Sequence, residues 1–173
     1  QKGAAVTVGY TDPTANNDAN AVQDAAGNDA ATLLSTTAVT NNSTVDSIAP
    51  LFQSAVLDAT GLKLTLTYSE ALSTTTAAAS AFAVKAGAVA QTVTSVAVSG
   101  STVVLTLASA IQKGAAVTVG YTDPTANNDA NAVQDAAGND AATLLSTTAV
   151  TNNSTVDSIA PLFQSAVLDA TGL

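Results

Sequence analysis

The chain has 173 residues, a net charge of −9, and no His or Cys, and its only basic side chains are four Lys. The lack of His and Cys excludes His-based acid–base catalysis, thiol chemistry, disulfides and the usual zinc sites. The excess of acidic over basic side chains disfavours nucleic acid and anionic membranes as partners and favours cations. No apolar run approaches the roughly 18 residues of a membrane-spanning helix, so we expect no membrane insertion.

A long internal repeat determines the organisation of the chain. Residues 1–62 recur without a single change as residues 112–173, at an offset of 111. A fold tolerates substitutions on its surface, so this identity indicates recent duplication or homogenisation of a tandem array. The sequence therefore predicts that neighbouring identical repeats are the partners of this chain.

The repeat boundaries follow from a polar stretch that ends in proline. This stretch, residues 151–161, reads as a linker because a proline forces the preceding residue to be extended. We predict one complete module over 46–156, the C-terminal part of a preceding identical repeat over 1–45, and the start of the next repeat over 157–173. We expect the strands missing from the two incomplete ends to come from adjoining chain.

Inside the module, apolar and polar residues alternate with the period of a half-buried strand. In chain order, this pattern predicts strands over 52–57, 62–68, 82–84, 96–98, 103–107, 117–121 and 145–150. The Ala-rich stretch 71–81 is compatible with a helical turn or a loop. About seven short strands in one module predict an all-β fold, an Ig-like antiparallel β-sandwich. A strand-rich solenoid is the alternative.

Between Tyr121 and Leu144 the alternation stops and side chains with oxygen ligands crowd together. The candidate ligands are Asp123, Asn128, Asp129, Asn131, Asp135, Asn139 and Asp140, and their copies Asp12, Asn17, Asp18, Asn20, Asp24, Asn28 and Asp29. Carboxylates close together repel one another, and calcium, which takes six to eight oxygen ligands, would relieve that repulsion. The cofactor predicted from this loop is calcium. The alternative is that these residues and Gly138 form Asx turns in a solvated loop.

Four further residues have two interpretations each. Glu70, which follows a predicted strand, either completes a metal site or is a solvated carboxylate. Asp157, in the linker, either bridges adjacent modules through an ion or caps a turn. Tyr68 and Tyr121 are expected in the core of the sandwich rather than on a ligand-binding platform.

Several of these strings resemble a known family. Residues 64–72, Leu-Thr-Leu-Thr-Tyr-Ser-Glu-Ala-Leu, and residues 121–124, Tyr-Thr-Asp-Pro, followed by the acidic run 128–140, resemble the repeat of giant bacterial cell-surface proteins. That family was first associated with cyanobacterial swimming motility and is labelled a flagellar-system-associated repeat. The Asp-x-Ala-Gly-Asn ending and the module start at Asp46 are similar, more distantly, to Ig-like domains of surface-layer proteins and adhesins.

The resemblance implies an extracellular, type I-secreted array of Ig-like modules with bound calcium, and it carries over no enzyme activity. It supports Asp123, Asp129, Asp135 and Asp140 as ligand candidates. We therefore expect a structural repeat that forms a fibre, stalk or coat at the cell surface, with lateral association into a filament as a further partner contact. The alternative is an adhesin module that binds carbohydrate, ice or a host surface. An enzyme is not expected, because a catalytic site is rarely duplicated without change along a polymer.

Overall fold

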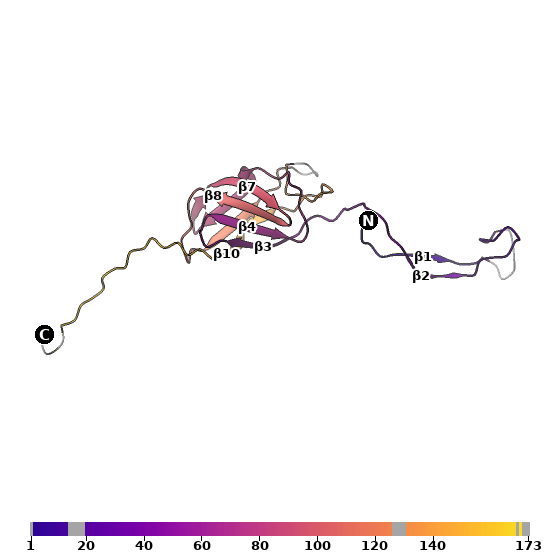
Figure 1. Cartoon of the computed structure of the whole chain (residues 1–173), viewed down its shortest axis with the longest axis horizontal. Coiled ribbons are helices and arrows are strands. Elements are labelled where there is room, and N and C mark those ends of the chain that lie inside the picture. The colour runs from indigo at the N-terminus through magenta and orange to yellow at the C-terminus, as the bar shows by residue number, and fades with distance from the viewer. Residues whose placement is uncertain (1, 14–19, 126–130, 169, 171–173) are drawn as a thin grey trace. The chain divides into compact units, whose positions relative to one another are not determined.

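The computed structural model describes residues 2–13, 20–125, 131–168 and 170, and the chain divides into two compact units, Gln1–Ser47 and Ile48–Leu173 (Figure 1). Among the described residues, no helix is both long enough and apolar enough to cross a membrane. The repeat boundaries predicted at 45/46 and 156/157 stay a prediction.

The described residues of the second unit, Ile48–Leu173, form eight strands and one short 3-10 helix, η1. In chain order these are β3 (Phe52–Leu57), β4 (Lys63–Tyr68), η1 (Ala79–Ala81), β5 (Phe82–Ala86), β6 (Val89–Gln91), β7 (Val93–Ser99), β8 (Thr102–Leu107), β9 (Val117–Tyr121) and β10 (Leu144–Asn152). The all-β prediction is confirmed. The sequence did not predict β6, whose three residues are too few to establish an alternating pattern.

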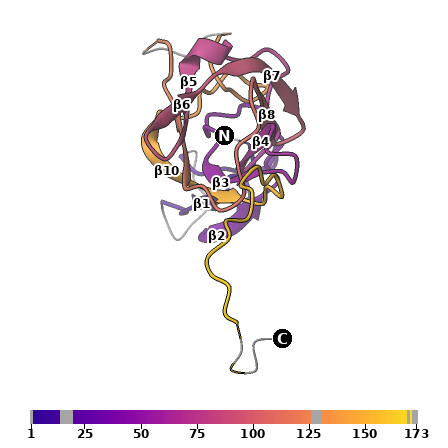
Figure 2. The same ribbon diagram turned by 90° about the vertical axis from the view of Figure 1, so that its left-hand side faces the viewer.

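The eight strands form two layers that are joined at one edge. Their order is β6-β5-β9-β10-β3-β4-β8-β7, and Figure 2 shows β5, β6 and β10 facing β4, β7 and β8 across the interior. All neighbouring strands are antiparallel except β10 and β3, which pair in parallel through Thr151 with Val56 and Asn152 with Leu57. This is the Ig-like arrangement, in which β3-β4-β8-β7 form one sheet and β10-β9-β5 form the other, with β6 as an additional edge strand.

The core lies between the two layers and is built from the residues that alternate along the strands. Its largest fully buried side chains are Tyr121, Leu57, Leu64, Leu66, Leu105, Val84, Val103, Val119, Val133 and Pro50. The ring of Tyr121 packs on Phe82 with centroids 5.2 Å apart, and Tyr68 contacts Phe52 edge to face at 6.0 Å. The prediction that both Tyr68 and Tyr121 belong to the core is confirmed.

The turn between β3 and β4 ties three separate parts of the second unit together. Gly61 has φ +69° and accepts a backbone hydrogen bond from Ile111, 3.0 Å. The carbonyl oxygen of Ile111 in turn accepts a hydrogen bond from the Ser154 hydroxyl, 2.7 Å. Burial opposes ionisation of Asp58, but hydrogen bonds from the Thr60 side chain and from the backbone N–H groups of Lys63 and Leu62 prevail and lower the pKa of this carboxyl.

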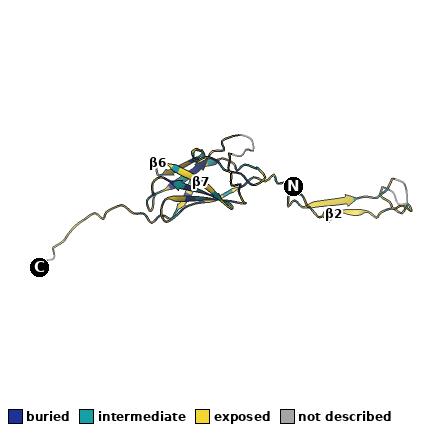
Figure 3. Ribbon diagram, turned by 45° about the horizontal axis from the view of Figure 1, so that its top comes forward, coloured by how far each residue is buried: buried dark blue, intermediate teal, exposed yellow. Residues whose placement is uncertain are grey.

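Among the described residues of the first unit, β1 (Val6–Tyr10) and β2 (Leu33–Val39) form an antiparallel hairpin. Its sequence is identical to that of β9 and β10, and so is its register: Val6 pairs with Val39 as Val117 pairs with Val150. Burial differs, however. Val8 is 46% exposed, whereas its copy Val119 is fully buried, and the hairpin is coloured as exposed in Figure 3. The hairpin geometry is therefore encoded locally, and its burial depends on neighbouring strands.

The C-terminal segment shows the same dependence on partners. Residues 162–168 repeat the sequence of residues 51–57, most of which form β3, but they form no strand. Their large apolar side chains, among them Phe163 and Val167, are almost fully exposed. Six of these seven positions form β3 between β10 and β4 in the second unit.

Candidate functional site

The acidic loop between β9 and β10 is anchored to the core rather than solvated throughout. Val133 is buried among the core residues, and its backbone N–H donates to the hydroxyl of Tyr121, 2.9 Å. The backbone N–H of Ala141 donates to the carbonyl oxygen of Val133, 2.7 Å. These contacts hold both ends of the segment that carries Asp135, so residues 131–141 are not solvated throughout.

Asp135 organises the turn that follows it. Its Oδ1 accepts hydrogen bonds from the backbone N–H groups of Ala137, 2.8 Å, and Asn139, 2.9 Å, and its Oδ2 accepts one from the Asn139 side chain, 2.8 Å. Gly138 completes the turn with φ +88°. Burial disfavours the charged form, but these hydrogen bonds outweigh burial and lower the pKa of Asp135.

The same turn forms in the first repeat. Asp24 accepts hydrogen bonds from the backbone N–H groups of Ala26 and Asn28 and from the Asn28 side chain, at 2.9 to 3.0 Å. The Asp24 turn is exposed, whereas the Asp135 side chain is buried. The Asx-turn interpretation of these residues is therefore correct for Asp135 and Asp24, and it leaves the calcium prediction open, because a carboxylate can cap a turn and also bind an ion.

Asp135 gives a testable pH dependence. Since its folded pKa is lowered, the stability it contributes is fully present above the unfolded pKa, about 3.9, and is lost as the pH falls through the folded pKa. Asp135→Asn should therefore destabilise the second unit at pH 7, by about 1 kcal/mol for loss of charge assistance. The difference in free energy of unfolding between wild type and variant should disappear below pH 4. Urea unfolding at several pH values from 7 to 2.5 measures this difference. A difference that stays constant with pH would contradict a stabilising role for the charged Asp135 carboxylate.

A second carboxylate lies next to Asp135. Carboxylate oxygens of Glu70 and Asp135 come within 4.8 Å of each other. Leu72 forms a β-bridge with Asp135, and the backbone N–H of Ser73 donates to the carbonyl oxygen of Gln134, 2.8 Å. The segment after β4 is thus held against the acidic loop, which brings together two carboxylates 65 positions apart in the sequence.

The other predicted ligands are distributed over the rest of the loop. Asp123 accepts a hydrogen bond from the backbone N–H of Thr125, 3.3 Å, and Gln134 forms a β-bridge with Asp140. Within the described part of the second unit, Asp123 and Asp140 do not join Asp135 in a group of three carboxylates. Four predicted ligands lie outside the described residues: Asn128, Asp129, Asn17 and Asp18. In the first repeat, the backbone N–H of Asp12 donates to the hydroxyl of Thr32. The carboxylate of Asp29 accepts a hydrogen bond from the Gln23 side chain. Asn20 lies on an exposed turn.

Asp157, the candidate ion bridge of the linker, makes a local turn. Its Oδ1 accepts a hydrogen bond from the backbone N–H of Ile159, 2.9 Å, and its side chain is exposed. This contact fits the capping interpretation of Asp157.

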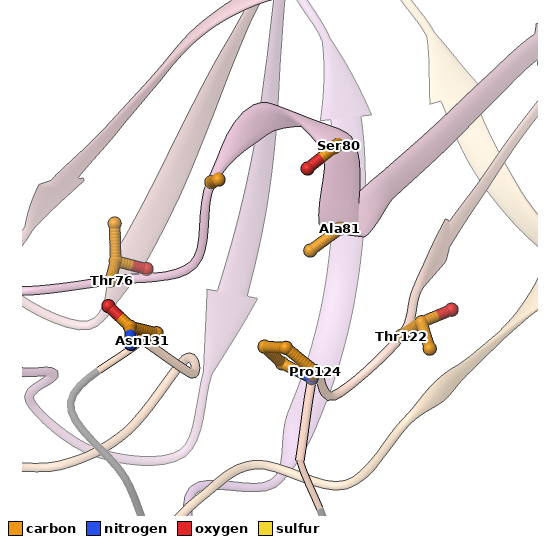
Figure 4. A pocket seen from close by; sticks show the side chains of 7 residues that line it. Thr76, Ser80, Ala81, Thr122, Pro124 and Asn131 are labelled. Atoms are coloured by element: carbon orange, nitrogen blue, oxygen red, sulfur yellow. The ribbon is translucent and has the colours of Figure 1, made fainter.

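A pocket of about 410 Å³ opens beside the loop (Figure 4). It is lined by Thr76, Ala78, Ser80, Ala81, Thr122, Pro124 and Asn131. Asn131, a predicted calcium ligand, faces Thr76 on one wall, opposite Pro124 and Ala81. Among the described residues, the lining offers hydroxyl and amide groups and no carboxylate.

Comparison with known proteins gives one family and two structures. No curated protein matches the chain. The N-terminal part of the bacterial S-layer protein SbsC is 23% identical with a TM-score of 0.48, and the match covers 61% of this chain and 24% of that one. The S-layer protein rSbsC(31-844) is 21% identical with a TM-score of 0.46, and the match covers 61% and 14%. The chain thus spans about a quarter or less of these structures.

The family match covers most of the predicted module over 46–156. Residues 45–126 match the family described as "Putative flagellar system-associated repeat". These residues run from the linker before β3 through β9 and include the string at 64–72 on which the resemblance was based. The predicted resemblance is confirmed: residues 45–126 are similar to this flagellar-system-associated repeat.

Proposed function

We propose that the chain is part of an extracellular structural array at the bacterial cell surface, in which identical Ig-like modules follow one another as a fibre, stalk or coat. The observation that carries the proposal is the unchanged recurrence of 62 residues at an offset of 111, together with a complete sandwich over β3–β10. Identical modules favour repeated neighbour contacts, which is how arrays gain stability. The role is structural rather than enzymatic.

Surface labelling tests this proposal. An antiserum raised against the chain should label intact cells of the producing bacterium as strongly as permeabilised cells, because the array lies outside the membrane. An antiserum against a cytoplasmic protein is the control and should label permeabilised cells only. Labelling that requires permeabilisation would contradict an extracellular array.

Calcium is the ion proposed to stiffen the module, with Glu70 and Asp135 as its carboxylate ligands. Their oxygens lie within 4.8 Å, a distance at which two negative charges repel each other and a cation is favoured. A carboxylate has about four lone-pair sites, so its oxygens can accept hydrogen bonds and also bind an ion. These donors are carboxylate oxygens, which suit calcium better than a softer metal.

Thermal unfolding measures calcium binding directly. A ligand that binds only the folded state stabilises it by RT ln(1 + [L]/Kd), about 2.7 kcal/mol at 100 times Kd. For a domain of this size, we expect the Tm to rise by about 10 °C between chelator and millimolar calcium, with a smaller rise in magnesium. Glu70→Gln should abolish the rise.

Asp157→Asn is the matched control, because this carboxylate is exposed and caps only its own turn. It should keep the full calcium-dependent rise. If Asp157→Asn removed the rise and Glu70→Gln kept it, the ion would lie at the junction between modules. No rise in wild type would leave the loop as an Asx turn without an ion.

A further inference from the structure

The pocket beside the acidic loop contains a hydroxyl whose hydrogen bond is missing. Among the described residues, the buried hydroxyl oxygens without a hydrogen-bond partner are those of Thr76 and Tyr68. Thr76 lines the pocket, and Figure 4 shows its hydroxyl turned toward the space between the labelled side chains. A buried hydroxyl without a partner costs free energy, and nearly all such groups in folded proteins are paired. The Thr76 hydroxyl therefore points to a ligand that supplies the partner.

The walls of the pocket are fixed by contacts with the rest of the second unit. The backbone N–H of Thr122, directly after β9, donates to the carbonyl oxygen of Ala81 in η1, 2.9 Å. Thr76 and Asn131 are each followed by an alanine that is almost fully buried. A pocket with its lining fixed in this way binds a ligand with little loss of conformational entropy.

The chemistry of the lining selects a neutral, hydroxylated ligand. Among the described residues, the lining has no charged side chain. The net charge of −9 disfavours anions, and a hard cation prefers carboxylate oxygens. An apolar ligand would leave the Thr76 hydroxyl without its hydrogen bond. The ligand class that remains is a neutral molecule with hydroxyl groups.

Polar and apolar groups lie on different sides of the pocket. Figure 4 shows Thr76 beside Asn131 on one wall, Ala81 and Pro124 on the opposite wall, and the Ser80 hydroxyl pointing inward. A sugar ring has the same division, because hydroxyl groups project from its edge and C–H groups cover its faces. The volume of about 410 Å³ is near the lower end of the range for small-molecule sites, roughly 300–1,000 Å³. The pocket thus suits a ligand of one or two sugar rings.

We propose that this pocket binds a neutral hexose unit of a glycan. The Thr76 hydroxyl and the Asn131 amide bind sugar hydroxyls, and Pro124 contacts a C–H face of the ring. Rotation of the Thr76 side chain between staggered χ1 positions turns its hydroxyl fully to the ligand. This binding activity goes beyond the structural role proposed above.

The pocket requires residues that occur once in each repeat. Thr76, Ser80 and Ala81 lie in the stretch 63–111, which occurs once in the chain. Tandem modules would present identical sites at regular intervals, and linked weak sites bind a polymer more strongly than one site alone. This avidity rests on the proposed function. Binding of one hexose to the chain does not, so its test stands whether or not an array lies at the cell surface.

Titration of the full 173-residue chain, followed by amide NMR, tests the site. The probes are the methyl pyranosides of glucose, mannose and galactose. The amide signals of Thr76 and Ser80 report binding without ambiguity, because neither residue has a copy in the chain. We expect these signals to shift saturably, with a millimolar Kd, for at least one probe, and not to shift with methyl glucuronoside, whose carboxylate the chain repels. No saturable shift with any neutral probe, or equal binding of the glucuronoside, would overturn the proposal.

Two matched substitutions locate the contact. Thr76 and Thr122 both line the pocket, but Figure 4 shows the hydroxyl of Thr122 pointing away from it. Thr76→Val should weaken sugar binding by about tenfold, because a sugar hydroxyl loses its partner. Thr122→Val should leave the affinity unchanged. Equal effects of the two substitutions, or wild-type affinity in Thr76→Val, would overturn the proposal.

Thermal unfolding of the same variants excludes a purely structural effect. Thr76→Val replaces a hydroxyl that has no hydrogen bond in the fold with a methyl group. The Tm of this variant should therefore equal or exceed that of wild type while its sugar affinity falls. A lower Tm would show that the Thr76 hydroxyl has a partner within the fold and would overturn its assignment to a ligand.

Discussion

Tyr121→Ala should destabilise the second unit by about 3–5 kcal/mol, a large part of the stability of an average domain. The side chain is fully buried, its ring packs on Phe82, and its hydroxyl accepts the backbone N–H of Val133. The substitution removes all three contributions and leaves a cavity in a core with few other aromatic residues. Urea unfolding followed by far-ultraviolet circular dichroism measures the loss.

The repeat supplies the matched control for this experiment. Tyr10 has the same sequence neighbours, and its hydroxyl accepts the backbone N–H of Val22 at the same distance, 2.9 Å. Tyr10→Ala should leave the unfolding of the second unit unchanged. Tyr121→Phe, which retains the ring, should cost only about 1–2 kcal/mol for the lost hydrogen bond. A Tyr121→Ala variant as stable as wild type would show that the ring does not support the core.

Gly61→Ala should destabilise the second unit by about 2–4 kcal/mol. The backbone at Gly61 has φ +69°, which costs an L-residue roughly 1–2 kcal/mol. A Cβ there would also overlap the carbonyl oxygen of Ile111 and lie 2.9 Å from the Ser154 hydroxyl oxygen. Since these groups join the β3–β4 turn to two distant segments, relief of the clash would break their hydrogen bonds. Thermal unfolding measures the effect.

Gly100→Ala separates the two causes. Gly100 also has positive φ, +57°, but a Cβ there would meet no atom within 4 Å. This variant should lose only the conformational contribution, about 1 kcal/mol. If the two variants lost the same stability, the close approach of Ile111 to Gly61 would contribute nothing to the destabilisation by Gly61→Ala.

The sequence predicted the strands well because their pattern is local. Alternation at 62–68 and 103–107 follows directly from a strand with one face in the core, and both strands form as expected. By contrast, β6 has three residues, and its pairing with β5 depends on a turn rather than on a hydrophobic pattern. The parallel pair β10–β3 was also missed, because joining the first strand of a module to its last is a property of topology that no local pattern records.

The candidate site was predicted only in part for a similar reason. Asp135 stands in a recognisable Asx-turn string, and that turn forms in both repeats whatever its burial. Glu70 was singled out as a carboxylate after a strand, but its proximity to Asp135 comes from the β-bridge at Leu72. A sequence separation of 65 residues does not predict such a contact. Density of carboxylates in the sequence is therefore a weaker guide than strand pairing to which of them meet.

The parallel pairing of β3 with β10 has a mechanical consequence. Tension along the chain pulls β3 toward its own N-terminal end and β10 toward its C-terminal end, in opposite directions along one shared axis. The pairs Val56–Thr151 and Leu57–Asn152, together with the hydrogen bond from Asn153 to Leu57, are then loaded in shear and must fail together. An antiparallel pair pulled apart from one end would open one bond after another. A module built in this way resists stretching up to a threshold force and then yields abruptly.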